Sequence, residues 1–188
     1  MVMVVVLALL AVLVIYSIGV YNGLVRLREG VRQAWANIDV ILVQRHDELP
    51  KLVESCKRYM QYEKEALERV MQARTSVFRA HERGDVAALG AAEGVLRAGL
   101  GQLYAVAENY PQLKADEGFQ HLRTRISQLE ESIADRRELY NGAVNLNNVR
   151  VAQFPDLFFA RLFGFTPAAL LEFTAEQKSD VDLKRLFD

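Results

Sequence analysis

Residues 35–77 decide the fold class, and they read WANIDVILVQRHDELPKLVESCKRYMQYEKEALERVMQARTSV. Apolar side chains recur there at alternating steps of three and four residues, which is typical of a helix that packs one face against other helices. Arg45 and Glu63 interrupt the stripe, and its register continues through Pro50. The pattern predicts one long helix over residues 24–82, kinked or frayed at the proline. The stripe consists of Trp35, Ile38, Leu42, Leu49, Leu52, Cys56, Tyr59, Ala66, Val70, Ala73 and Val77.

A second helix is expected at residues 86–109. The Gly84-Asp85 pair before it supplies a helix stop and a new N-cap, and a proline follows its end. The helix is rich in Ala and Gly, and Gly90 and Gly94 lie one turn apart. Each glycine costs about 1 kcal/mol of helix propensity relative to Ala, so we expect a neighbouring helix to approach closely there.

A third long helix is expected from residue 116 or 117 to the Phe154-Pro155 pair, on the same spacing. Asp156 as an N-cap and Gly164 as a stop then bound a short helix rich in aromatic residues. We expect this short helix to cover the end of the bundle, with docking to a membrane surface or a partner as the alternative. No window alternates with a period of two, so no strand is expected.

Toward the N-terminus, residues 1–25 contain no charged residue, and only Ser17, Gly19, Asn22 and Gly23 lie outside the hydrophobic set. At about 1.5 Å per residue, this run can cross a hydrocarbon core about 30 Å thick. A cleaved signal peptide is the alternative, but no basic segment precedes the run. The fold class predicted is all-α: an N-terminal transmembrane helix continues into a long antiparallel bundle of three long helices, followed by a short C-terminal helix. The expected boundaries are 1–25 for the span, 26–154 for the bundle, and 155–188 for the short helix and tail.

The charges that follow the apolar run predict its orientation. Arg26, Arg28 and Arg32 come directly after it, against the single acidic residue Glu29. The positive-inside bias favours a cell membrane protein, in the inner or plasma membrane, with its N-terminus outside and its domain in the cytoplasm. Cys56 is the single cysteine and forms no intrachain disulfide, which fits a reducing compartment.

The expected helix lengths leave part of the first helix without cover. A helix over residues 24–82 would be about 90 Å long, and one over 86–109 about 36 Å. Trp35, Ile38 and Leu42 would then lie on a membrane-proximal stalk with an exposed apolar seam. A break at Pro50 or cover by the tail would remove this exposure, and association of copies of the chain along the stalk is the favoured alternative.

Several blocks of the sequence resemble the bacterial LemA family, in order along the chain. They are YNGLVRLR at 21–28, AWANIDV at 34–40, RHDELP at 45–50, ENYPQLKA at 108–115, RELYN at 137–141 with Asn147 and Phe154-Pro155, and RLFGF at 161–165. The chain departs from the family pattern at Glu48, Lys51 and Leu146. The resemblance implies an N-terminally anchored protein with a soluble domain of long antiparallel helices and no established catalytic activity.

Residues that could carry catalysis or hold a metal are few. The histidines are His46, His81 and His121, and no Glu-x-x-His motif accompanies them. Cys56 lies near two basic residues, but no His is placed by sequence to act as its base. The 23 Lys and Arg are balanced by 24 Asp and Glu, so a basic footprint for nucleic acid is lacking. We expect no cofactor, metal, nucleic-acid partner or catalysis; a membrane-tethered hydrolase that uses Cys56 or a histidine is the alternative.

Polar positions on the apolar stripes are the more informative candidates. Arg45 and Glu63, with Arg136 and Asn147 on the third helix, either reach the edge of the bundle or form interhelical pairs that fix its register. In the second case, Leu at Arg45 and Glu63 would disturb assembly more than the melting temperature. The full set of candidate interaction or structural residues is Trp35, Ile38, Leu42, Arg45, Glu63, Glu108, Tyr110, Pro111, Arg136, Tyr140 and Asn141.

The function expected from these observations is non-catalytic. The chain would be a membrane-anchored helical interaction or assembly protein, with an unidentified protein partner and a possible homo-oligomer formed through the stalk. The stalk seam is the favoured contact surface, and the turn at residues 108–114 comes next.

Overall fold

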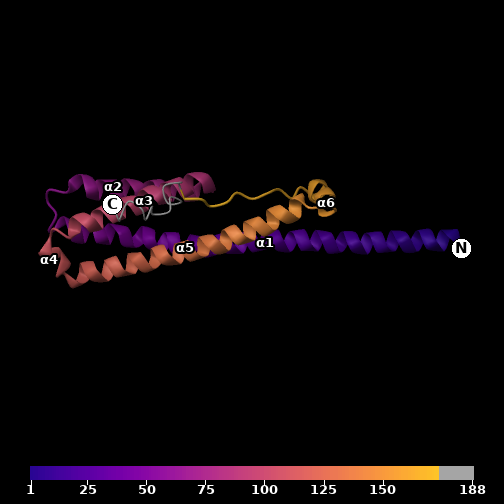
Figure 1. Ribbon diagram of the computed structural model, residues 1–188, viewed down its shortest axis with the longest axis horizontal. Coiled ribbons are helices and arrows are strands. Elements are labelled where there is room, and N and C mark those ends of the chain that lie inside the picture. The colour runs from indigo at the N-terminus through magenta and orange to yellow at the C-terminus, as the bar shows by residue number, and fades with distance from the viewer. Residues whose placement is uncertain (174–188) are drawn as a thin grey trace, which may run out of the picture. The chain divides into compact units, whose positions relative to one another are not determined.

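The computed structural model describes residues 1–173, and in this range it is helical with no strand (Figure 1). The predicted all-α fold class is therefore confirmed. The helices are α1 Val2–Lys57, α2 Lys64–Glu82, α3 Val86–Ala107, α4 Pro111–Lys114, α5 Glu117–Ala152 and α6 Asp156–Phe163. The expected tail beyond residue 173 lies outside the described residues.

The chain divides into two compact units. Among the described residues, unit 1 consists of Met1–Asp39 and Arg136–Leu170, and unit 2 consists of Val40–Asp135 and residues 171–173. Unit 1 thus contains the first part of α1, the last part of α5, and α6. Unit 2 contains the end of α1, the first part of α5, and α2, α3 and α4 between them.

In unit 1, α5 packs antiparallel to α1 and α6 lies against both. The rings of Trp35 and Tyr140 are 5.3 Å apart, and farther along, Leu24 shares a small core with Val151. This core also holds Val20, Ala160 of α6 and Phe165.

In unit 2, three helix segments run alternately up and down. His46 near the end of α1 stacks on Phe78 near the end of α2 at 4.4 Å, so these two segments form an antiparallel hairpin. Helices α2 and α3 pack side by side as a second hairpin. The core consists mainly of buried leucines, and its fully buried members include Leu49, Leu52, Leu89, Leu96, Leu100 and Leu103.

The prediction that the first helix continues to residue 82 is wrong. Helix α1 does run through Pro50, but it ends at Lys57, where the carbonyl oxygen of Cys56 accepts hydrogen bonds from the backbone N–H groups of Tyr59 and Met60 at 3.0 and 2.8 Å. Met60 is buried in the turn that follows. The stripe of the sequence, which passes through Tyr59, therefore continues over residues that are not helical, and Met60 takes the buried position beside it.

The turn between α2 and α3 forms as the sequence predicts. Gly84 adopts a left-handed conformation with φ of +65°, which glycine tolerates without a steric cost. The carboxylate of Asp85 accepts a hydrogen bond from the backbone N–H of Ala88 at 2.9 Å and so caps α3.

The exposed stalk seam expected at residues 35–42 is not present. Ile38 is fully buried in unit 1, and Leu42 is buried in unit 2. The physical reason is the length of α5, whose 36 residues span about 54 Å and supply the cover that α3 alone could not. The seam therefore gives no physical reason for copies of the chain to associate along it.

Candidate functional site

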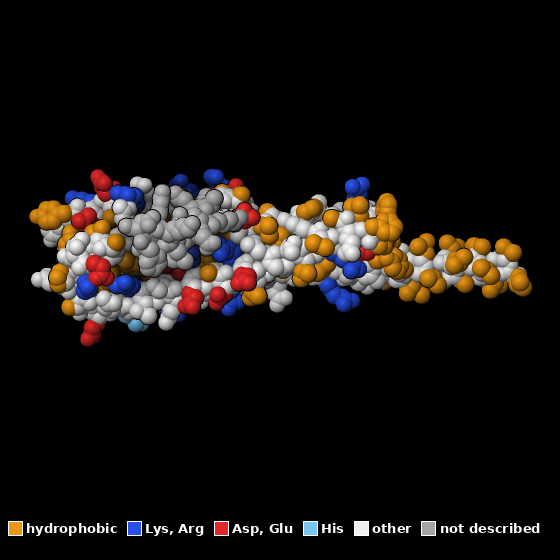
Figure 2. All heavy atoms as spheres, viewed as in Figure 1, with side chains coloured by type: hydrophobic (Ala, Val, Ile, Leu, Met, Phe, Trp, Pro, Cys, Tyr) orange, Lys and Arg blue, Asp and Glu red, His pale blue; other side chains and the backbone are white. Residues whose placement is uncertain are grey.

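The N-terminal part of α1 has the properties of a membrane span. It is long and apolar enough to cross a bilayer, and the most apolar 18-residue window has no buried residue. Hydrophobic side chains cover its surface (Figure 2). A polypeptide that exposes so many contiguous apolar side chains needs a cover other than water. This is a candidate membrane helix by length and composition.

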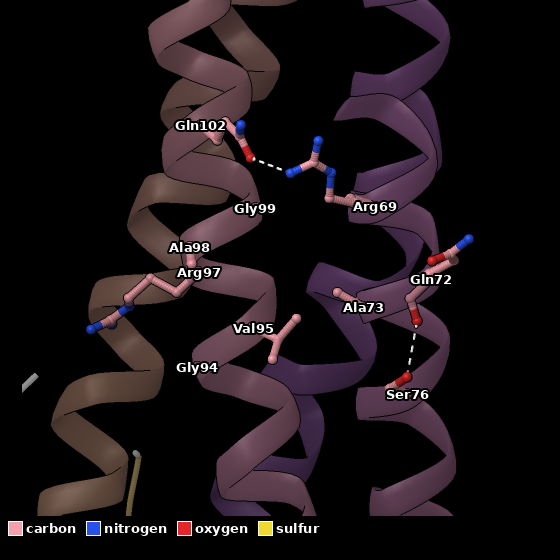
Figure 3. A pocket seen from close by; sticks show the side chains of 10 residues that line it. All are labelled: Arg69, Gln72, Ala73, Ser76, Gly94, Val95, Arg97, Ala98, Gly99 and Gln102. Carbon is pink, nitrogen blue, oxygen red and sulfur yellow. Dashed lines mark hydrogen bonds between the residues drawn. The ribbon is translucent and has the colours of Figure 1, made fainter. Parts of the chain in front are cut away.

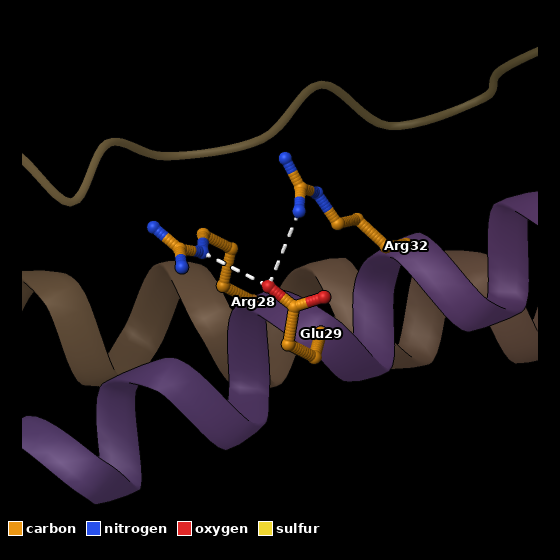
Figure 4. A network of polar contacts seen from close by, with 3 residues as sticks. All are labelled: Arg28, Glu29 and Arg32. Carbon is orange, nitrogen blue, oxygen red and sulfur yellow. Dashed lines mark hydrogen bonds and ion pairs between the residues drawn. The ribbon is translucent and has the colours of Figure 1, made fainter.

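A charged cluster follows the apolar run on α1. The carboxylate of Glu29 accepts hydrogen bonds from Arg28 and from Arg32, each at 3.3 Å (Figure 4). All three side chains are about half exposed or more, so the pairs contribute little stability. With Arg26 also exposed, the cluster carries a net positive charge next to the apolar run.

A buried ionic cluster lies inside unit 2. The guanidinium of Arg45 donates a hydrogen bond to the carboxylate of Glu93 on α3, and both side chains are under 5% exposed. Glu130 on α5 is close enough for the charges of Arg45 and Arg97 to attract its carboxylate. Burial nevertheless raises the pKa of Glu130 above its ordinary value, and among the described residues its Oε1 atom accepts no hydrogen bond. The desolvation of the Glu130 carboxylate thus outweighs the attraction of the two arginines.

The sequence marks Glu93 as a core position, although a search for apolar residues at helical spacing passes over it. The apolar stripe of α3 passes from Leu89 to Leu96, and the position skipped between them is Glu93. An acidic residue at a core position requires a buried cation. Arg45, at the core position skipped in α1, is that cation.

Glu63, Tyr110 and Pro111 come together at the end of unit 2. Glu63 precedes α2, and its carboxylate accepts a hydrogen bond from the hydroxyl of Tyr110 at 3.3 Å. Pro111 is the first residue of α4, where its missing N–H costs nothing. Exposed Glu108 pairs with Lys114, whose hydrogen bond lowers the pKa of the Glu108 carboxyl, and with Arg123 at 3.6 Å. These contacts fix the turn at residues 108–114.

The candidates on the last part of α5 divide between the core and the surface. Tyr140 is buried, and its hydroxyl donates to the carbonyl oxygen of Ala169 at 2.9 Å. Asn147 is also buried, and Asn141 is half-buried. Arg136 was expected on the seam but is exposed, because the buried face passes from Ile133 to Tyr140 in two turns with position 136 off that face.

Asn148, which the sequence analysis did not single out, holds the chain after α6. Its side-chain amide donates to the carbonyl oxygen of Ala168 at 2.9 Å and accepts from the N–H of Ala168 at 2.8 Å. This two-point contact mimics the pairing of two backbone strands. It fixes the extended segment that follows Gly164 against α5.

Gly90 is a point of close approach, as expected, but the neighbour is not a helix. A Cβ atom at Gly90 would overlap the backbone carbonyl of Glu172, in the extended chain that crosses α3. Leu171 and Phe173 on either side are buried, and Arg97 lies 5.7 Å from the centre of the Phe173 ring.

An open groove of about 650 Å³ lies between α2 and α3 (Figure 3). The guanidinium of Arg69 on α2 donates to the side-chain oxygen of Gln102 on α3 at 3.0 Å across it. Its α3 wall consists largely of small residues, among them Gly94, Ala98 and the exposed Val95.

Two of the groups proposed for a hydrolase, Cys56 and His46, are buried or in contact with other side chains. Cys56 is fully buried, and burial raises the pKa of its thiol to about 12. His46 stacks on Phe78 and lies 2.6 Å from Arg74, and burial together with that cation lowers its pKa. His121 is exposed on α5. Within residues 1–173, no three His, Cys, Asp or Glu side chains converge where they could hold a metal ion.

Comparison with known proteins gives related sequences. The chain is 25% identical over 171 residues to the magnetosome proteins MamQ 1 and MamQ 2 of Paramagnetospirillum magneticum strain AMB-1, an alignment that covers 79% of this chain and 63% of each relative. It is 32% identical over 78 residues to magnetosome protein MamQ of Magnetospirillum gryphiswaldense, covering 42% of this chain and 29% of the relative. The chain thus spans about 63% of the length of the first two relatives.

The family assignment rests on a longer match. Residues 34–184, which include every candidate interaction or structural residue, match the LemA family. With its apolar N-terminal helix and its helical architecture, this membrane-associated chain belongs to the LemA family.

Proposed function

We propose that the chain is a single-pass membrane protein that presents its helical units to the cytoplasm and acts by non-catalytic contact with a partner protein, as an assembly or adaptor element. The apolar run of α1 and the arginines that follow it support the anchor and its orientation. The relatives are magnetosome proteins by name, and we carry no partner or process from them to this chain.

The proposed contact with a partner rests on the exposed face of α3. None of its exposed residues is charged: they are Ala87, Ala88, Ala91, Val95, Ala98, Gly101, Gln102 and Ala105. A helix on the surface of a bundle normally turns charged residues to water. An uncharged face of small residues instead lets the backbone of another helix approach closely.

The chemistry of this face indicates what binds there. A partner helix that packs beside Val95 would fill the groove between α2 and α3, with Arg69 and Gln102 at its rim to pair with polar groups. The partner is either a second protein or another copy of the chain.

The experiment places a charge at the centre of the face. Val95→Glu should reduce the mass of the complex that the chain forms in native membranes, because a buried carboxylate without a partner is costly at an interface. Leu139→Glu is the matched control: Leu139 in unit 1 and Val95 are 68% and 63% exposed, respectively. The readout is the mass of the complex after extraction in mild detergent, with two differently tagged copies to reveal self-association.

The proposal fails if Val95→Glu and Leu139→Glu give complexes of the same mass as the unchanged chain. It also fails if the unchanged chain is a monomer in native membranes.

The hydrolase alternative would use Cys56 or a histidine, and the thiol of Cys56 is buried with its pKa raised to about 12. Cells that carry Cys56→Ala together with Ala at His46, His81 and His121 should therefore retain the complex. Loss of a chemical activity in that variant, with the complex intact, would instead support the enzyme.

A further inference from the structure

We propose that α6 is a second membrane contact: its exposed apolar side lies in the interface of an anionic phospholipid bilayer, beside the point where α1 enters it. This inference rests on the proposed function to the extent that α1 must be inserted. It adds a lipid-binding surface on an element far from α1 in the sequence.

The first observation is where α6 attaches. Its Phe159 ring lies 6.3 Å from that of Tyr16, and its Phe163 ring lies 5.0 Å from that of Tyr21. Both tyrosines belong to the uncharged run of α1. Helix α6 is therefore packed on the part of α1 that is itself apolar, and Val20 and Leu24 of that part are buried in the core that they share with Val151 and Ala160.

The position along α1 sets the depth of α6. Arg26 is the first charged residue after the run and belongs at the level of the lipid headgroups. Tyr21 and Tyr16 precede it by five and ten residues, or about 7.5 and 15 Å along the helix. Because the headgroup region on each side of the hydrocarbon core is about 5–7 Å thick, Tyr21 lies at the edge of the core. Phe163, which packs on Tyr21, shares that level, and Phe159, which packs on Tyr16, lies deeper.

The second observation is what α6 and Phe154, two residues before it, expose. Phe154, Phe158 and Leu162, spaced four residues apart, are 74%, 63% and 75% exposed, and Phe163 is 51% exposed. Phe154 and Phe158 contact each other edge to face at 5.8 Å. Four large apolar side chains on so short a segment form a patch that water solvates poorly. Aromatic and leucine side chains are the residues with which interfacial helices enter a bilayer.

Charge near the patch selects an anionic surface. Arg26, Arg28 and Arg32 follow the span against Glu29, and Arg161 on α6 is exposed. The acidic residue of α6, Asp156, is buried and ion-paired with Arg150, so it presents no negative charge to lipid. A cationic border around an apolar patch complements phospholipid headgroups rather than a neutral protein surface.

The test is the quenching of tryptophan by brominated lipid. The full chain with Trp35→Phe, which keeps an aromatic ring against Tyr140, receives one new tryptophan at a time and is reconstituted in vesicles of brominated phosphatidylcholine and phosphatidylglycerol. Phe158→Trp and Leu162→Trp report on α6, and Leu10→Trp reports on the span. Val95→Trp is the matched control, because Val95 and Phe158 are both 63% exposed.

We expect Phe158→Trp and Leu162→Trp to lose emission to brominated lipid, to an extent approaching that of Leu10→Trp, while Val95→Trp keeps its emission. If the α6 reporters are quenched by acrylamide in water and not by lipid, α6 does not dock on the membrane and the inference is overturned. Protection of the α6 reporters from both quenchers means that protein, such as a second copy, covers the patch, which also overturns it.

The span reporter separates this inference from the proposed function. Quenching of Leu10→Trp with no quenching on α6 leaves the anchor in place and removes only the α6 contact. No quenching of Leu10→Trp contradicts the anchor, and the α6 inference falls with it.

Discussion

Arg45 shows what a polar residue on an apolar stripe does once its surroundings are known. Its partner, Glu93, lies on α3 of the same chain, and both are buried. The pair therefore links two helices of unit 2, and its removal should be visible in stability measurements on that unit. We propose that the pair also sets the register of the bundle.

Arg45→Met should lower the free energy of unfolding by about 3–5 kcal/mol, because it leaves the carboxylate of Glu93 buried without its cation. The double variant Arg45→Met with Glu93→Leu removes both charges and should recover most of this loss. Denaturant unfolding in detergent, followed by circular dichroism, measures both. Equal losses in the single and double variants would show that the pair contributes only side-chain volume.

Glu130 provides a prediction about pH. Burial raises the pKa of its carboxyl in the folded state, so the folded chain holds this proton at pH values where the unfolded chain has released it. Its effect is absent below the unfolded pKa of about 4.3, and the free energy of unfolding falls as the pH rises through the folded pKa. Glu130 thus destabilises the fold at neutral pH.

Glu130→Gln, which keeps the shape without the charge, should therefore raise stability at pH 7 by about 1–2 kcal/mol and leave it nearly unchanged near pH 4. The exposed neighbour Glu131 gives the control variant Glu131→Gln, with little expected effect. The measurement is the melting temperature at the two pH values. A loss of stability at pH 7 in Glu130→Gln would mean that the charged carboxylate is favourable where it lies.

At the scale of helices and segments, Gly90 and Gly101 on α3 make a matched pair. Ala at either removes the propensity cost of a glycine in a helix, about 1 kcal/mol. A Cβ atom at Gly101 meets no atom within 4 Å, whereas one at Gly90 would overlap the carbonyl of Glu172.

Gly101→Ala should therefore stabilise the fold by up to about 1 kcal/mol. Gly90→Ala should destabilise it by about 2 kcal/mol, because the displaced chain uncovers buried Leu171 and Phe173. Thermal unfolding of the two variants gives the signs. If the Gly90→Ala variant is as stable as the Gly101→Ala variant, the backbone at Glu172 does not pack against Gly90 in solution.

The helices were largely predictable because their ends carry local signals. The Gly84-Asp85 turn, Pro111 and Gly164 all act through the conformation of single residues. Asp156, expected as an N-cap, is instead the first residue of α6, and among the described residues no side chain caps that helix with a hydrogen bond. The end of α1 at Lys57 has no such residue, and the apolar stripe of the sequence passes through its turn at Tyr59. The buried seam at Ile38 depends on the reach of α5, a tertiary property that spacing within one helix does not report.

The sequence identifies unusual residues at the candidate sites, but it does not identify the residues that they contact. The sequence marks Arg45 as unusual, yet only folding brings Glu93 and Glu130 to it. The uncharged outer face of α3 could not be recognised until the structure showed which side of this Ala-rich helix is exposed. Arg136 illustrates the converse, since a position on an ideal seam lies on the surface.

For the molecule as a whole, the account combines an anchor with surfaces for contact. The apolar run of α1 and the α6 patch face lipid in our proposals, and the uncharged face of α3 faces a protein. Only one side of a membrane is consistent with the positive-inside bias of Arg26, Arg28 and Arg32. The orientation of α1 in the membrane therefore decides which proteins the helical units can contact.

A single cysteine reporter tests this orientation directly. Tyr62, between α1 and α2, is 92% exposed, whereas the native Cys56 thiol is buried and protonated at neutral pH and should react little. Tyr62→Cys in intact cells should resist a membrane-impermeant maleimide and become labelled after the membrane is permeabilised. Labelling of Tyr62→Cys in intact cells would place the helical units outside the cytoplasm and contradict the account.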